Sequence, residues 1–229
     1  MVHEVQVYQG KVRAYTEAGI DPSAIVKTRA SGVLTLTPLG LAEDEQAEKR
    51  FHGGPDRALC HYPREHYAYW RQTLPAIAER FQASAFGENL STEGMTEDNV
   101  FIGDVWQWGQ TLIQVTQPRS PCYKLNDHFG VADLSVQMQA SGRCGWLYRV
   151  VGAGKVDCAE GLRLVARTGA VSVAEAIYIA FGQPFAEARC QRLLSAPGLS
   201  ASWTKTMLLR LQNQQVEDFN RRLLNQVGG

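Results

Sequence analysis

The chain changes character near residue 170, and this change limits the folds that it can adopt. Before that point, short segments rich in β-branched and aromatic residues alternate with turn residues. Examples are GVLTLTPLG at 32–40, DVWQWGQTLIQVT at 104–116 and GWLYRVVGAGKV at 145–156. Gly10 and the GQ pair at 109–110 have the composition of hairpin turns. Many short strands separated by turns are typical of a closed or nearly closed antiparallel barrel. We therefore predict a mostly β domain with helical insertions over residues 1–169.

Helical patterns replace the strand patterns after residue 170. The sequence SVAE at 172–175 has the form of a capping box, in which Ser172 is the N-cap and Glu175 reaches back to it. Further apolar runs at helical spacing follow, separated by breakers such as APG at 196–198. We predict a small helical bundle over residues 170–229. Its residues that cover apolar surface of the β domain should include Trp203, Leu208 and Leu211.

Charge and cysteine content exclude several classes of protein. The chain has 229 residues with 23 basic and 23 acidic side chains, so no net charge steers it toward nucleic acid. Five scattered cysteines without a CxxC pair are typical of a reduced, cytoplasmic protein. No apolar run is long enough to cross a membrane, and the N-terminal residues have no signal-peptide core. We therefore expect a cytoplasmic protein with neither a nucleic-acid nor a membrane partner.

Two stretches before residue 100 have the composition of ligand-binding turns. In HGGPDR at 52–57, paired glycines let backbone N–H groups approach an anion, and the Arg57 guanidinium can grip a phosphate. In GENLSTEGM at 87–95, Glu88 and Asn89 can recognise a hydrogen-bonding ligand edge. Taken alone, the first stretch is explained equally well by an ordinary turn, and the second is explained better by one.

The stretch QPRSPCYKL at 117–125 presents a single thiol, Cys122, from a proline-rich loop. Its prolines restrict the backbone, and the cations Arg119 and Lys124 favour the ionised thiolate. A buried structural cysteine is the alternative, but such residues usually lie in apolar strands, as Cys60 does in ALC. We therefore predict that Cys122 is functional.

These three stretches together resemble a bacterial MOSC-domain protein of the YiiM type. The resemblance rests on HGGPDRAL, GENLSTEGMTEDNVFIGDVWQWG and QVTQPRSPCYKL, in this order and spacing. It extends from about residue 28 to 165, and the helical tail resembles the three-helix extension of this subgroup. The resemblance implies a mostly β fold with α elements, namely a MOSC-type β-barrel followed by a small helical bundle. It also implies that the fold binds the molybdenum cofactor (molybdopterin).

The resemblance further implies a set of site residues. It makes Cys122 the catalytic residue and the molybdenum ligand, and a soft thiolate suits a thiophilic metal. Nearby cations would meet the phosphate of the cofactor. By similarity, the residues around the cofactor are His52, Gly53, Gly54, Arg57, Asn89, Arg119 and Ser120.

The implied activity is reduction of N-hydroxylated compounds, with detoxification of the base analogue 6-N-hydroxylaminopurine as the leading case. In such an oxidoreductase the cofactor carries the redox chemistry, while the protein supplies ligand, orientation and electrostatics. The sequence shows no ferredoxin-like cysteine cluster and no flavin or nicotinamide motif. An unidentified electron-donor protein is therefore implied as a partner.

Two other classes of function fit the same residues. A non-catalytic carrier of the molybdenum cofactor or of sulfur would bind stoichiometrically without turnover. A metal-free cysteine hydrolase would use Cys122 as the nucleophile and His52 or His128 as the base, and it would form a covalent acyl intermediate. The spacing of Cys60, His61 and His66 lacks the second pair that a zinc site needs.

Overall fold

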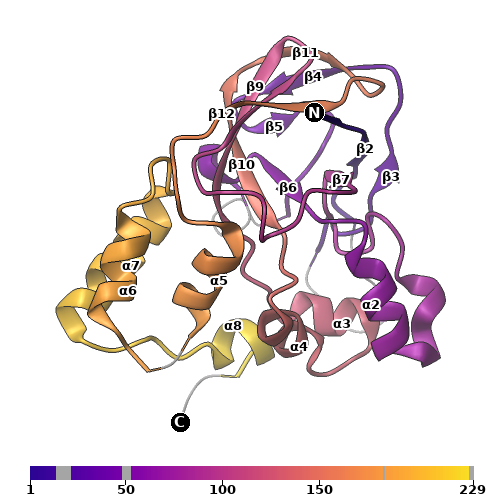
Figure 1. Cartoon of the computed structure of the whole chain (residues 1–229). Coiled ribbons are helices and arrows are strands. Elements are labelled where there is room, and N and C mark those ends of the chain that lie inside the picture. The colour runs from indigo at the N-terminus through magenta and orange to yellow at the C-terminus, as the bar shows by residue number, and fades with distance from the viewer. Residues whose placement is uncertain (14–21, 48–52, 183, 227–229) are drawn as a thin grey trace.

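A nine-stranded sheet forms the body of the computed structural model, and the helices gather at one end of it (Figure 1). The structure describes residues 1–13, 22–47, 53–182 and 184–226. In spatial order the strands are β1 (Val2–His3), β12 (Leu162–Ala166), β8 (Val105–Trp108), β9 (Thr111–Pro118), β10 (Trp146–Gly152), β6 (Leu59–His61), β7 (Leu90–Thr92), β2 (Val5–Gln9) and β3 (Thr28–Arg29). A three-stranded sheet follows the order β11 (Gly154–Asp157), β4 (Val33–Thr37) and β5 (Gly40–Leu41).

All neighbouring strands are antiparallel except β6 and β7. The predicted mostly β fold with a C-terminal helical bundle is confirmed. Within the described residues the edge strands β1 and β3 do not pair with each other, so the barrel stays open at this seam. The turn expected at 109–110 joins β8 to β9. The turn expected at Gly10 is wrong, because the Gly10 N–H donates to Asp44 Oδ1 at 2.8 Å and the pairing strand β3 begins only at Thr28.

The helices fall into two groups along the chain. Those inserted between strands are η1 (Pro55–Arg57), α2 (His66–Thr73), η2 (Pro75–Arg80), α3 (Lys124–Phe129) and α4 (Leu134–Ser141). Those of the tail are α5 (Val173–Phe181), α6 (Glu187–Leu194), α7 (Ala201–Asn213) and α8 (Asn220–Leu224). Within the described ranges, no helix combines the length and the apolar character that crossing a membrane requires.

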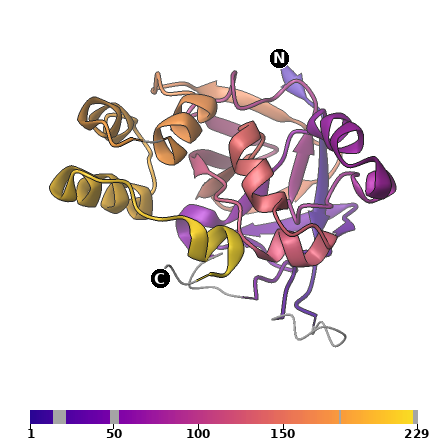
Figure 2. The same cartoon turned by 90° about the horizontal axis from the view of Figure 1, so that it is seen from below.

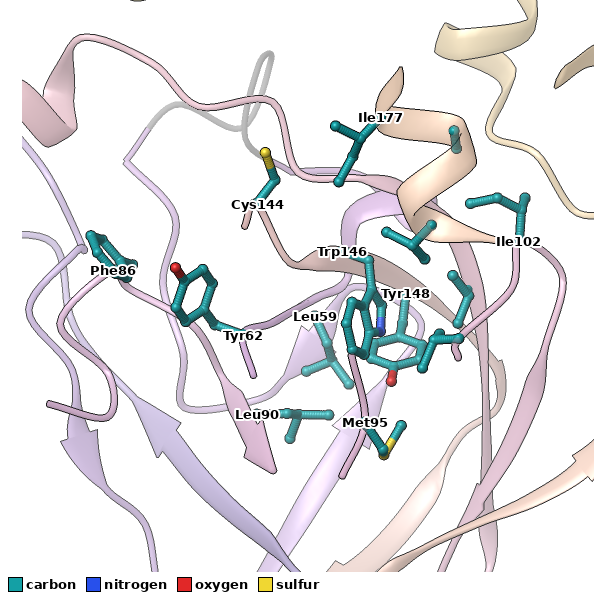
Figure 3. Packing of buried hydrophobic residues seen from close by; sticks show 14 of the residues in the cluster. Leu59, Tyr62, Phe86, Leu90, Met95, Ile102, Cys144, Trp146, Tyr148 and Ile177 are labelled. Atoms are coloured by element: carbon teal, nitrogen blue, oxygen red, sulfur yellow. The ribbon is translucent and has the colours of Figure 1, made fainter. Parts of the chain in front are cut away.

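Aromatic side chains fill the interior between the strands. Leu59, Leu90, Trp146 and Tyr148 meet inside the sheet with no exposed surface, and Ile177 of α5 belongs to the same cluster (Figure 3). Burying each such side chain contributes roughly 1.5–3 kcal/mol. The tail helices are therefore joined to the β domain through a common core.

The start of α5 shows how far local sequence patterns hold. Ser172 is the N-cap, and its hydroxyl oxygen accepts from the Glu175 N–H at 3.0 Å, as predicted. The Glu175 carboxylate, which was expected to reach back to Ser172, pairs instead with Arg192 of α6 at 2.8 Å and ties two tail helices together.

The apolar cover that α7 supplies differs in part from the prediction. Trp203 is buried and Leu211 packs partly against the core, as expected. Leu208 is 54% exposed, so its predicted role is wrong. The buried stripe of α7 runs through Trp203, Met207 and Arg210, and Leu208 lies about 100° round the helix from Met207.

The short helix α8 leaves the tail bundle and lies beside α3 and α4 (Figures 1 and 2). Leu223 is buried there, and its carbonyl oxygen accepts from Asn126 Nδ2 at 2.9 Å and from Ser135 Oγ at 2.7 Å. The end of the described chain is thus anchored to the helices that follow the Cys122 loop.

His61 gives the fold a specific acid sensitivity. Its ring stacks on Trp146 at a centroid distance of 4.2 Å, Nε2 lies 2.9 Å from Thr92 Oγ1, and Nδ1 lies 3.2 Å from the Tyr148 hydroxyl. Burial lowers the pKa of His61 from 6.5 to about 3. The stability that this neutral ring contributes is therefore present above the unfolded-state pKa and is lost as the pH falls toward the folded-state value.

We expect the unfolding free energy to fall by about 1.4 kcal/mol per pH unit from His61 as the pH drops below about 6.5. His61→Gln keeps hydrogen-bonding groups at this position but does not titrate there. Urea unfolding at pH values from about 7.5 to about 5 should show a flatter pH slope for the variant, although its stability is lower throughout. An equal slope in the two proteins would contradict this role of His61.

Candidate functional site

A cavity of about 1010 Å³ lies where the ends of the strands meet the helices. Distant parts of the chain contribute its walls, from the segment before β3 to the residues of α8. The lining residues that bear on its chemistry are Lys27, Asp44, Glu45, Arg57, Cys60, Asn89, Arg119, Ser120, Cys122, Tyr123, Lys124, Glu217, Asp218, Phe219, Arg221 and Arg222. The volume matches the upper end of small-molecule sites, roughly 300–1,000 Å³.

Cys122 lies half-buried in the wall of this cavity, on the loop between β9 and α3. The loop leaves the sheet at Arg119, whose N–H donates to the Gly145 carbonyl at 3.0 Å. After the thiol, the Leu125 N–H donates to the Cys122 carbonyl at 3.0 Å and begins the turn into α3. The proline-rich stretch thus carries the thiol to the wall of the cavity.

Arg119 brings a buried cation to the same wall. Its Nη1 atom is buried and has no hydrogen-bond partner within the described residues. Burial acts to lower the pKa of Arg119, but the neighbouring Cys60, Cys122 and Glu88 groups outweigh it and raise that pKa. An unsatisfied buried donor costs about 1–3 kcal/mol, more when it is charged. Arg119 also lines the cavity, so an anionic group of a ligand there would lie beside its positive charge.

The charge of the cavity wall favours an anion. Six cationic and four acidic side chains line it. Lys27 and Asp44 neutralise each other in an ion pair whose side chains are almost fully buried. Glu217 pairs with Arg210 at 2.7 Å, outside the lining, and this partner lowers the pKa of Glu217 although burial opposes it. The wall therefore carries a net positive charge, which attracts anionic groups.

The structure brings most of the predicted site residues together. Arg57, Asn89, Arg119, Ser120 and Cys122 all line the one cavity. Arg57 lies in η1, where Nη2 donates to Ser202 Oγ of α7 at 3.1 Å, and burial lowers its pKa.

Two further predicted residues, Gly53 and Gly54, do not join this group, since neither is among the described residues that line the cavity. Gly54 is the N-cap of η1, and its φ of 98° is a conformation that glycine adopts without strain. His52 lies outside the described residues. His128, the other base considered for a hydrolase, is likewise absent from the described lining of the cavity, and burial lowers its pKa to about 4.

The side chain of Asn89 is already engaged in the protein. Its Nδ2 donates to Asp44 Oδ2 at 2.8 Å and to the Tyr8 carbonyl at 3.2 Å, while its Oδ1 accepts from the Cys60 N–H at 3.1 Å. Asn89 therefore ties β2, β6 and the segment after β5 into one wall of the cavity.

Sequence reasoning missed Cys60 as a lining residue. It was expected inside the apolar interior, but it lines the cavity, while its neighbours Leu59 and His61 point into the core. The two-residue period of a strand is the signal that separates Cys60 from these neighbours. Burial raises the pKa of Cys60, which keeps this second thiol protonated at neutral pH.

Sequence reasoning also missed the contribution of the C-terminal segment. Glu217, Phe219 and Arg222 line the cavity about 100 residues after Cys122 in the chain. No local pattern marks these residues, because their position depends on how α8 docks against α3 and α4. His61 and His66 do not form a metal site, and the described ranges hold no group of three or more His, Cys, Asp or Glu that could hold a metal ion.

Two family models match this chain, one in its β part and one in its helical tail. A family model described as the MOSC domain matches residues 48–163, and one described as a YiiM-like, 3-alpha helix domain matches residues 171–214. The chain is 57% identical over 223 residues to protein YiiM of Escherichia coli (strain K12), covering 97% of this chain and 99% of that protein. The crystal structure of YiiM from Escherichia coli matches with a TM-score of 0.85 and 50% identity, covering 97% of this chain and 98% of that one.

A more distant relative has a name that describes an enzymatic activity. A protein named reductase from Gibberella moniliformis (strain M3125 / FGSC 7600) is 34% identical over 164 residues, which cover 71% of this chain and 29% of that protein. The resemblance indicated by the three sequence motifs is confirmed by these matches. The chain belongs to the MOSC-domain family, in its YiiM-like branch.

Proposed function

We propose that this chain is a molybdenum cofactor-dependent reductase of N-hydroxylated compounds, with 6-N-hydroxylaminopurine as its leading substrate. Membership of the MOSC family and the relative named reductase support a redox role. The observation that carries the proposal is that Arg119 and Cys122 lie in the wall of the same positively charged cavity. This arrangement suits a ligand that combines an anionic group with a thiophilic centre.

The residues of the cavity fit such a cofactor. Cys122 would supply the soft donor to the metal, and Arg119 would donate to the phosphate, with Arg57 and Lys124 on the same wall. Two thiols line the cavity, but the raised pKa of Cys60 keeps it protonated and a poor metal ligand. This leaves Cys122 as the thiol that would bind the metal.

When bound, the cofactor supplies the two-electron chemistry in which R–NHOH, two electrons and two protons become R–NH2 and water. The protein's own part is binding and orientation. Arg119 keeps its positive charge over the working pH range because the neighbouring groups raise its pKa. We further propose that the protein acts in the cytoplasm and receives its electrons from a separate donor protein.

The central prediction concerns the thiol. We expect Cys122→Ser to fold normally but to retain almost no molybdenum, because a serine hydroxyl is a hard and weakly acidic donor. The loss should exceed the roughly 10–100-fold that removing an outer-shell partner of a metal typically costs. Elemental analysis of protein made in a cofactor-competent host, together with reduction of 6-N-hydroxylaminopurine by a supplied electron donor, measures this outcome. Cys60→Ser is the matched control, and it should retain the metal.

Full reductase activity in Cys122→Ser would exclude ligation by this residue. A normal molybdenum content without turnover in the wild type, given a competent donor, would identify a carrier instead.

Replacing Arg119 should have opposite effects on cofactor binding and on the stability of the cofactor-free protein. In Arg119→Met, loss of a charge-assisted hydrogen bond worth about 1.5–3 kcal/mol should reduce bound pterin on the order of 10–100-fold. The cofactor-free variant should be at least as stable as the wild type, because the variant no longer buries an unsatisfied charged donor. Pterin content and urea unfolding measure the two effects. Arg163→Met, which removes an exposed arginine of β12, should change neither quantity, and wild-type pterin content in Arg119→Met would contradict the assignment.

A further inference from the structure

One arginine of the last helix contacts both peptide groups that join Cys122 to its neighbours. Arg222 Nη1 donates to the carbonyl oxygen of Pro121, which belongs to the peptide group before the thiol residue. The N–H of Tyr123, which belongs to the peptide group after it, donates to the Arg222 carbonyl at 2.8 Å. Because a peptide group is planar and rigid, holding both planes leaves little freedom at the Cys122 backbone.

These contacts restrict torsions that the two prolines leave free. A proline ring fixes only its own φ, so Pro118 and Pro121 do not set ψ at Pro121 or either torsion at Cys122. The Leu125 N–H bond to the Cys122 carbonyl lies on the helix side of the thiol. The Arg222 guanidinium holds the Pro121 carbonyl on the other side of the thiol.

The Arg222 guanidinium is itself held from several sides. Its Nη2 donates to Gln139 Oε1 of α4 at 2.5 Å. Its centre lies 5.1 Å from the ring centroid of Phe181 and 5.2 Å from that of Phe219, within reach of cation–π attraction. Planar donors in a fixed fork suit such multiple contacts, and a lysine ammonium cannot reproduce them.

The segment that carries Arg222 is also fixed. Arg210 of α7 is 3% exposed and donates to both Glu217 carboxylate oxygens at 2.7 Å, just before α8 begins. The same guanidinium donates to the Ala180 carbonyl at 2.8 Å. On the other side of Arg222, the buried Leu223 is bonded to α3 and α4 through its carbonyl oxygen.

We propose that Arg222 is the positioning residue of Cys122, and that the last helix is therefore a working part of the site in the β domain. The arginine sets the direction of the thiol by holding the peptide groups on both sides of it. The proposal rests on the proposed function only in taking Cys122 as the functional thiol. The contacts themselves exist without any cofactor.

The test begins with cofactor-free protein. Amide hydrogen exchange of Tyr123 reports on the docking of α8, because this N–H donates to the backbone carbonyl of residue 222, which the variants keep. In Arg222→Met the loss of the guanidinium contacts should let α8 open more often, so this exchange should become about tenfold or more faster. Arg222→Lys keeps the charge and one donor, so its exchange rate should be intermediate. Arg189→Met is the matched control, because Arg189 also lies in the tail, over the Tyr178 ring at 4.8 Å, and does not line the cavity. It should exchange like the wild type.

The loaded enzyme gives the second readout. Misplacing a catalytic ligand should lower kcat on the order of 10–100-fold in Arg222→Met, while KM for the N-hydroxylated substrate stays unchanged. Arg222→Lys should recover part of kcat. Wild-type exchange at Tyr123 together with wild-type kcat in Arg222→Met would overturn the proposal.

A further variant keeps the proposal testable if Arg222→Met does not fold. Gln139→Leu leaves Arg222 in place and removes one partner of its guanidinium. It should accelerate Tyr123 exchange by a smaller factor, and an unchanged rate would count against the proposal. Failure of the proposed function shows itself differently, as a wild-type protein that binds no molybdenum while the exchange pattern still follows Arg222.

Discussion

The antiparallel pairing of β9 with β10 fixes the point at which the Cys122 loop leaves the sheet, and the site depends on it. At this point the Arg119 N–H donates to the carbonyl of Gly145, just before β10. Gly145 has a φ of 71°, and a Cβ there would lie 2.1 Å from the His61 carbonyl oxygen, so no other residue fits. The buried Glu97 carboxylate accepts from the Gly145 N–H at 2.7 Å. Gly145 and the buried Glu97 therefore fix the position at which the Cys122 loop begins.

Local patterns predicted the parts of the fold that depend on neighbouring residues. The capping serine at Ser172, the turn at 109–110 and the mostly β character before residue 170 all follow from short-range rules. The expected turn at Gly10 failed because a tertiary contact with Asp44 competes with the local signal. Leu208 failed because the buried stripe of α7 is narrow, and helical spacing alone does not fix which residues it includes.

The same distinction between local patterns and long-range contacts applies to the residues of the candidate site. Arg119, Ser120 and Cys122, which the sequence names as site residues, line the same cavity because they lie within one short loop. Asn89 lines the cavity as predicted, but its bonds to three distant segments could not be foreseen, since they depend on how β2 and β6 pack. The contribution of α8 to the cavity wall could not be predicted from the sequence for the same reason. It arises from contacts between residues separated by about 100 positions in the chain.

The docking of α8 has a consequence for the order in which the protein matures. A ribosome makes the strands and the thiol loop long before it makes residues 220–224, and domains generally fold as they emerge. The nascent β domain can therefore assemble its core while one wall of the cavity is still missing. A bulky group can enter at that stage, or in an opening of α8, more easily than after the helix has docked. The wall that α8 supplies is therefore the last part of the cavity to be completed.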